Sequence, residues 1–198
     1  MSTILGEALW HEANNFWFNE LSPKQWFSSS EALDQTIKER FSDALEALTT
    51  QGQIPPVTKA SLARCNIHNE RDVLAAILIT DQFSRNIHRG SSKAFATDPL
   101  ALSLSEYLIS SEALKHFSTV EVQFALMPYM HNETLEAQDI SVAMFTKFDI
   151  KLALASALEH QELIRRFGRF PHRNDLLGRE STSVEKEYLK NGKKFGQG

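Results

Sequence analysis

Cysteine and long hydrophobic runs are nearly absent from this chain of 198 residues, and each absence excludes a class of protein. The single cysteine, Cys65, leaves no intrachain disulfide and no cysteine-based zinc site. No apolar run approaches the roughly 20 residues that a membrane-spanning helix needs. The first residues, MSTILGEALWHEANNFWF, lack the basic start and unbroken apolar core of a signal peptide. We therefore expect a cytoplasmic protein in which Cys65 is structural.

Glycine is scarce as well, with 8 residues in the chain, and the glycine-based ligand motifs are missing. The sequence has no GxxxxGK[ST] phosphate loop, no dinucleotide-binding GxGxxG and no GxSxG nucleophile elbow. His-x-Glu occurs at residues 68–70, 131–133 and 160–162, but positions i and i+2 do not share a helix face. Neither a metal site nor a cofactor is expected.

Charge of one sign is not in strong excess either. The chain carries 21 Lys and Arg against 25 Asp and Glu, which gives a net charge of −4. A global attraction to nucleic acid or to an anionic membrane is therefore not expected, and neither is predicted as a partner. A local basic patch is compatible with this balance.

Helix signals, in contrast, run along most of the sequence. We expect helices over residues 28–51, 70–89 and 99–111, and two helices between residues 134 and 167 that meet near Asp149. Asn69 is a predicted N-cap, and Asp98 is another, with Pro99 at the first helical position. Strand-like alternation is absent. The sequence predicts one all-α domain over residues 1–198, built as an antiparallel helical array, with a short tail at its end.

Two further helix starts carry the reciprocal pattern of a capping box. Ser118 and Glu121 form one such pattern, and Thr182 and Glu185 form the other. We expect a helix to begin after each of these serine or threonine residues.

Polar residues follow apolar ones on one face of the helix predicted over residues 70–89. Leu74 and Leu78 lie on the same face as Asp81, Gln82 and Arg85. Asp81 and Arg85 are four residues apart in the favourable order for an ion pair. The pair is either a partly buried structural salt bridge or part of a functional site, and the sequence favours neither.

A histidine among apolar residues is the second candidate. His131 follows Met127, Tyr129 and Met130 in the stretch MPYMHNETLEAQ, and Glu133 lies two residues later. Such a histidine can exchange protons near neutral pH. More often it is a neutral core residue with one satisfied hydrogen bond, so both interpretations stand.

The stretch RRFGRFPHRNDLLGR, residues 165–179, carries five arginines and one histidine. The planar guanidinium suits bidentate contact with a carboxylate or phosphate, so Arg169, His172 and Arg173 predict an anion-binding pocket, with Arg166 or Arg179 as further candidates. In the alternative, the same arginines lock loops by pairing with acids such as Asp81 and Glu133.

Four other residues of this stretch predict its shape. Gly168 and Pro171 are expected to bend the chain after a long helix, and Phe167 and Phe170 to anchor the bend in the core. Near the N-terminus, FWFNELSPKQWF, residues 16–27, holds an aromatic cluster that either lines a pocket or, as is more usual, belongs to the core.

Five stretches occur in a recognisable order: FWFNELSPKQWF, DQFSRNIHRGSSKAFATDPLAL, MPYMHNETLEAQ, HQELIRRFGRFPHRNDLLGRESTSVE and a closing YL. Together they resemble the bacterial domain-of-unknown-function family 924 over nearly the whole chain. The resemblance implies an all-α fold similar to tetratricopeptide-like helical arrays and implies little about biochemistry. The polar residues that match the family's motifs are Asp81, Gln82, Arg85, Arg89, His131, Glu133, Gln138, His160, Arg166, Arg169, His172, Arg173, Asn174 and Arg179.

Two functions fit these residues. A small-ligand binder, whether or not it is an enzyme, would bind a small anionic molecule and use acid–base residues beside it. A tetratricopeptide-like binding module would use the arginines to clamp an acidic peptide. The mixture of residue types favours the pocket, with catalytic candidates His131, Glu133 and Asp81 and ligand-binding candidates Gln82, Arg85, His160, Arg169, His172 and Arg173. The sequence leaves the oligomeric state open.

Overall fold

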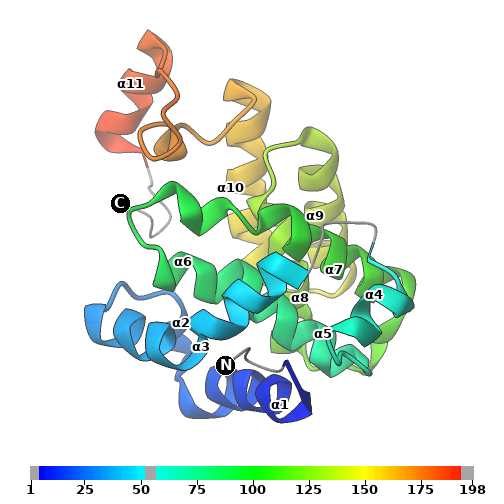
Figure 1. Ribbon diagram of the computed structural model, residues 1–198. Coiled ribbons are helices and arrows are strands. Elements are labelled where there is room, and N and C mark those ends of the chain that lie inside the picture. The colour runs from blue at the N-terminus through cyan, green and yellow to red at the C-terminus, as the bar shows by residue number, and fades with distance from the viewer. Residues whose placement is uncertain (1–4, 52–56, 193–198) are drawn as a thin grey trace.

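The computed structural model describes residues 5–51 and 57–192, and every regular element in these ranges is helical (Figure 1). The α-helices are α1 (Glu7–Asn15), α2 (Pro23–Trp26), α3 (Glu31–Gln51), α4 (Lys59–Arg64), α5 (Glu70–Ile77), α6 (Ser84–Ile87), α7 (Asp98–Ser110), α8 (Thr119–His131), α9 (Leu135–Lys147), α10 (Lys151–Phe167) and α11 (Ser183–Asn191). The predicted all-α class is confirmed. The likeness to tetratricopeptide arrays and the single domain stay predictions, and the predicted tail falls on residues 193–198, outside the described ranges.

Shorter elements lie between the α-helices. Two are π-helices, η1 (Phe16–Glu20) and η2 (Leu78–Phe83), and three are 3₁₀-helices, η3 (Ser92–Phe95), η4 (Ala113–His116) and η5 (Pro171–Arg173). The helix predicted over residues 70–89 is therefore α5, η2 and α6 in succession. Uniform α-helical geometry for that stretch was a wrong prediction, and the difference matters at the functional site.

Local capping chemistry sets most helix starts. The Asn69 side chain accepts hydrogen bonds from the backbone N–H groups of Arg71 and Asp72, as a helix N-cap does. The predicted cap at Asp98 is wrong by one residue, because α7 begins at Asp98 and Thr97 is its N-cap. The Asp98 carboxylate instead contacts arginine side chains from other parts of the chain.

Both predicted capping boxes are present. The Ser118 hydroxyl accepts from the Glu121 N–H, and the Glu121 carboxylate accepts from the Ser118 N–H at 2.8 Å. Thr182 and Glu185 make the same exchange at the start of α11. The predicted junction near Asp149 is also present, since this residue adopts a left-handed conformation with φ of 51° between α9 and α10.

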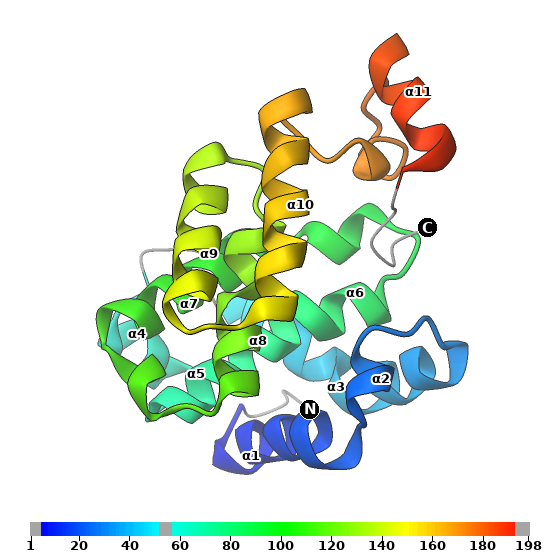
Figure 2. The same cartoon turned by 180° about the vertical axis from the view of Figure 1, so that it is seen from behind.

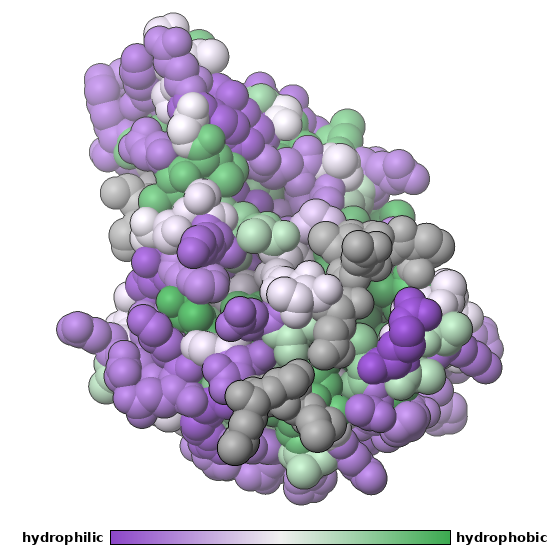
Figure 3. All heavy atoms as spheres, in the orientation of Figure 1, coloured by the Kyte–Doolittle hydropathy of each residue, from purple (hydrophilic) through white to green (hydrophobic). Residues whose placement is uncertain are grey.

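The helices pack on one another in succession. Helix α5 packs against α7, α7 against α8, α8 against α9, and α9 against α10, while α1 and α3 cover α5, η2 and α6 from another side. Figures 1 and 2 show α9 and α10 side by side in both views, and α11 at one end of the molecule. No helix in the described ranges has both the length and the apolar character needed to cross a membrane. Hydrophilic residues dominate the face shown in Figure 3, where hydrophobic ones form small patches.

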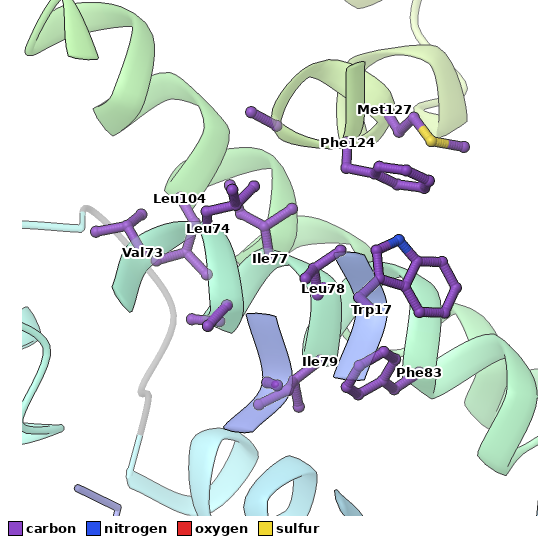
Figure 4. Packing of buried hydrophobic residues seen from close by; sticks show 14 of the residues in the cluster. Trp17, Val73, Leu74, Ile77, Leu78, Ile79, Phe83, Leu104, Phe124 and Met127 are labelled. Carbon is purple, nitrogen blue, oxygen red and sulfur yellow. The ribbon is translucent and has the colours of Figure 1, made fainter. Parts of the chain in front are cut away.

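The main core is centred on an aromatic group from three separate segments. The Trp17 ring lies between those of Phe83 and Phe124, with both pairs of ring centroids 5.4 Å apart (Figure 4). All three side chains are almost completely buried. Burying one such side chain stabilises a fold by roughly 1.5–3 kcal/mol. The interpretation of the N-terminal aromatics as core is thus correct for Trp17.

A second, smaller hydrophobic cluster holds the chain that follows α10. Its buried members are Leu163, Ile164 and Phe170, and the half-buried rings of Phe167 and Tyr188 pack against them. Gly168 ends α10 in the left-handed region, with φ of 69°. The predicted bend is therefore present, but its phenylalanines anchor it in this separate cluster and not in the main core.

Candidate functional site

A pocket of about 320 Å³ lies where η2, α8, α10 and the chain around η5 meet. It is lined by Trp26, Phe27, Ser28, Ser29, Gln82, Arg85, Asn86, Arg89, Met127, Met130, His131, Ser156, His160, His172 and Arg173. The predicted site residues among them are Gln82, Arg85, His131, His160, His172 and Arg173. The remaining predicted residues, Asp81, Glu133 and Arg169, are not among the lining residues.

The π-helix η2 and the following α6 provide Gln82, Arg85 and Asn86 to the pocket lining. A π-turn inserts extra backbone into a helix and displaces its carbonyl groups from regular pairing, and such turns are frequent at functional sites. Here the Thr80 carbonyl accepts hydrogen bonds from the hydroxyls of Thr97, at 2.6 Å, and Ser84, at 2.8 Å. Asp81 and Gln82 are the next two residues of η2, so this arrangement sets their positions.

Asp81 is completely buried directly behind the pocket wall. Its carboxylate contacts His131 Nδ1 at 2.8 and 3.0 Å, Arg85 Nη1 at 3.1 Å and Gln82 Nε2 at 2.6 Å. Burial alone would raise the pKa of Asp81, but the charge of Arg85 and the contacts with His131 and Gln82 outweigh it and hold that pKa well below its usual range. The ion pair predicted between Asp81 and Arg85 is present, with Asp81 as a buried anion.

His131 lies between Asp81 and the pocket. Burial lowers its pKa, an effect that Arg85 reinforces and Asp81 opposes, so the imidazole is neutral at pH 7. An ionised carboxylate can only accept a hydrogen bond, which assigns the imidazole proton to Nδ1. The lone pair is then on Nε2. This pairing is the arrangement in which a histidine acts as a general base oriented by an aspartate.

Two further histidines line the pocket, and both are neutral at pH 7. His160 Nδ1 donates to the Ser156 carbonyl at 2.8 Å, and burial lowers the pKa of His160 to about 3. His172 stacks on Phe170 with ring centroids 5.6 Å apart, and burial lowers the pKa of His172 to about 4. The pocket therefore has three neutral imidazoles that can accept hydrogen bonds from an occupant.

The positive charge at the pocket comes from arginines. Arg173 is 6% exposed, and its guanidinium lies 4.5 Å from the Phe95 ring centroid and 4.7 Å from that of Phe170. Its Nη1 contacts Asp98 at 3.3 Å, and the same carboxylate contacts Arg85 at 3.0 Å. Burial lowers the pKa of Arg173 to about 10, because the nearby carboxylates, that of Asp98 first, offset only part of the effect. Its Nε atom has no hydrogen-bond acceptor, so this cation is under-compensated.

Arg89, which matches the family motif, adds a third guanidinium to the lining. Its Nε and Nη2 atoms donate to the two oxygens of Asp34 at 2.6 and 2.9 Å. Asn86 donates to the same carboxylate at 2.7 Å. Asp34, like Asp81 and Asp98, is not among the residues that line the pocket.

Glu133 and Arg169 were both predicted to take part in the site, and the structure places them outside the pocket lining. Glu133 accepts the Phe170 N–H at 2.7 Å and pairs with Arg179 at 2.6 and 3.0 Å. Burial would raise the pKa of Glu133, but these two contacts lower it below its usual value. Arg169 pairs with Glu185 at 2.7 and 2.8 Å. For these residues the structural alternative, in which arginines lock the loops, describes the observed contacts.

Sequence reasoning missed one whole wall of the pocket. Trp26 and Phe27 were favoured as core residues, and Met127 and Met130 were noted only as neighbours of His131. The structure brings them together with Ser156, which was not considered. A signal for Ser156 exists, because it lies four residues before His160 and so on the same face of a helix.

The arrangement combines an oriented base, arginine side chains and an apolar wall around one space. Such a space can hold an organic anion and exchange a proton with it. In the described residues, no group of three or more His, Cys, Asp or Glu side chains is placed to hold a metal ion.

Comparison with known proteins gives a family and a fold. Residues 13–193 match a family described as "Bacterial protein of unknown function (DUF924)". A solved structure of a protein of unknown function, ATU0120 from Agrobacterium tumefaciens, superposes with a TM-score of 0.82 and 33% sequence identity, covering 93% of this chain and 98% of that one. No curated protein matches the chain.

Proposed function

The chain belongs to the DUF924 family of bacterial proteins of unknown function, and from its pocket we propose that it binds a small anionic molecule in the cytoplasm. His131, oriented by Asp81, is the group that would exchange a proton with the bound molecule. On this proposal, Arg85, Arg89 and Arg173 provide the attraction for negative charge.

One observation carries the proposal. Three arginines line the pocket, whereas the carboxylates that pair with them, Asp34, Asp81 and Asp98, are absent from the lining. An occupant would therefore meet guanidinium groups and neutral imidazoles before any negative charge. This order favours an anion over a cation.

The alternative of a carboxylate clamp for an acidic peptide has less support. A clamp needs several available arginines along one open surface. Arg169 and Arg179 are held by Glu185 and Glu133 of the same chain, and neither lines the pocket that contains Arg173.

A thermal-shift screen with organic acids, inorganic phosphate and nucleotides tests the proposal. We expect at least one anion to raise the melting temperature of the protein, because a ligand that binds only the folded state stabilises it. Arg173→Met should abolish that rise. Arg169→Met is the matched control, since it removes an ion-paired arginine of the same segment that lies outside the pocket, and it should keep the rise.

The opposite pattern would contradict the proposal. If no anion of any class stabilises the protein, the pocket does not bind anions. If Arg173→Met and Arg169→Met both lose the rise in melting temperature, the anion does not depend on the arginine that lines the pocket. Should Arg173→Met fail to fold, Arg89→Gln provides the second test, because Arg89 is only half-buried and also lines the pocket.

A further inference from the structure

Part of the pocket lining is apolar, and these residues restrict what can occupy the pocket. Trp26, Phe27, Met127 and Met130 provide two aromatic rings and two thioethers among the lining residues. Trp26 is fixed by a hydrogen bond from its Nε1 to the Trp17 carbonyl at 2.7 Å. Such side chains pack well against flat or aliphatic groups and offer nothing to a small, fully hydrated ion.

Phe27 is the most informative of these apolar residues. Its side chain is 61% exposed, although it stacks at 13° on the buried Phe124 ring and meets Trp26 edge to face. An isolated exposed phenylalanine is unremarkable, but one that lines a pocket exposes apolar surface where a ligand can cover it.

The charge balance around the pocket limits the charge of the occupant. The guanidinium groups of Arg85, Arg89 and Arg173 are matched in number by the carboxylates of Asp34, Asp81 and Asp98. The described lining contains neither lysine nor glycine, so it lacks the ammonium group and the close backbone approach that phosphate sites commonly use. A single negative charge suits this balance better than a phosphate dianion.

We propose that the occupant is an organic monocarboxylic acid with a flat apolar body, held with its carboxylate at Arg173 and its body against Trp26 and Phe27. This inference rests on the proposed function and narrows it from small anions in general to one chemical class. The carboxylate relieves the under-compensated charge of Arg173, and the body covers the exposed ring of Phe27.

Calorimetric titration of the intact protein with four matched probes tests the inference. Phenylacetate carries both features, acetate lacks the apolar body, phenylacetamide lacks the charge, and phenyl phosphate replaces the carboxylate by a dianion. We expect phenylacetate to bind at least tenfold more tightly than each of the other three. Phenyl phosphate binding as tightly as phenylacetate would overturn the monocarboxylate, and acetate binding as tightly would overturn the apolar body; either result leaves anion binding intact. Phenylacetamide binding as tightly would overturn the role of the charge.

Two variants locate the apolar contact. Phe27→Ala should weaken phenylacetate binding several-fold and leave acetate binding unchanged. Leu152→Ala is the control, because Leu152 is 86% exposed and is not a lining residue. Equal effects of the two variants would overturn the assigned position of the body. If none of the four probes binds, and the wider anion screen is also negative, the proposed function fails together with the inference.

Discussion

Three histidines line a pocket in which all of them are neutral at pH 7. For His160 the physical cause is mainly burial, which lowers its pKa to about 3, while an unfolded chain would have the ordinary value near 6.5. The unfolded state therefore binds more protons between these two values. The free energy of unfolding then rises with pH across this window, and stability is lost as the pH falls from about 6.5.

Replacing His160 should flatten this dependence. Each excess proton on the unfolded chain contributes a slope of about 1.4 kcal/mol per pH unit, so we expect His160→Gln to reduce the slope between pH 6 and pH 4.5 by about that amount. Urea denaturation at a series of pH values measures it. Parallel curves for the wild type and His160→Gln would contradict the burial of a neutral imidazole.

Single residues also show which contacts around the pocket could be predicted from the sequence and which could not. The i,i+4 spacing predicted the ion pair between Asp81 and Arg85, which is present. His131 was singled out as a histidine among apolar residues, and its contact with Asp81, fifty residues earlier, was not predicted. Glu133 was placed with His131 because it is two residues away. Helix α8 ends at His131, however, and Glu133 then contacts the backbone of Phe170 and the side chain of Arg179. Contacts across 37 residues or more do not follow from local spacing.

At the scale of elements, the π-helix η2 has a carbonyl, that of Thr80, which accepts hydrogen bonds from two side-chain hydroxyls. The Thr97 side chain makes no cap hydrogen bond for α7 and donates to the Thr80 carbonyl at 2.6 Å. Both residues are buried. Thr97→Val keeps the shape of the side chain and removes this bond, so we expect the free energy of unfolding to fall by about 1–2 kcal/mol.

An exposed threonine provides the comparison. The Thr36 hydroxyl also donates to a backbone carbonyl, that of Ala32, but on the exposed surface of α3. Water can replace that bond, so Thr36→Val should change the unfolding free energy by less than about 0.5 kcal/mol. Chemical denaturation of both variants gives the two values. A loss for Thr97→Val no larger than that for Thr36→Val would show that the hydroxyl is not needed to hold η2.

The difference between local and distant contacts explains how much of the fold could be predicted from the sequence. Helix starts at Asn69, Ser118 and Thr182 were predicted because a cap and its partners lie within three residues of one another. The π-turn at η2 was not predicted, and one of the two hydroxyls that donate to its Thr80 carbonyl comes from Thr97, seventeen residues later. Local propensity therefore predicts helices and most of their ends, while tertiary contacts determine the geometry that positions the site.

At the scale of the whole molecule, the described residues form two hydrophobic clusters of unequal size. The main core extends over α1 to α10, whereas the C-terminal segment, residues 168–192, is attached through the small cluster around Phe170. Figure 2 shows this segment at the edge of the molecule, next to the end of α10. A segment with few buried apolar contacts opens at a lower free energy than the main core. This segment nevertheless supplies His172 and Arg173 to the pocket.

Glu133, between α8 and α9, contacts Phe170 and Arg179 of this segment, which makes it a positioning residue for the pocket. Glu133→Gln keeps an acceptor for the Phe170 N–H and removes the charge that pairs with Arg179. The pair is about a quarter exposed, so we expect a loss of no more than about 1 kcal/mol, or roughly threefold to fivefold faster amide hydrogen exchange in the segment. Exchange in α5 and α8 should stay the same, because the main core does not depend on the pair. Asp175→Asn removes an exposed charge of the same segment and should change neither. Uniformly faster exchange throughout the protein would mean that the segment unfolds only with the core, and His172 and Arg173 would then be held in the pocket by the fold as a whole.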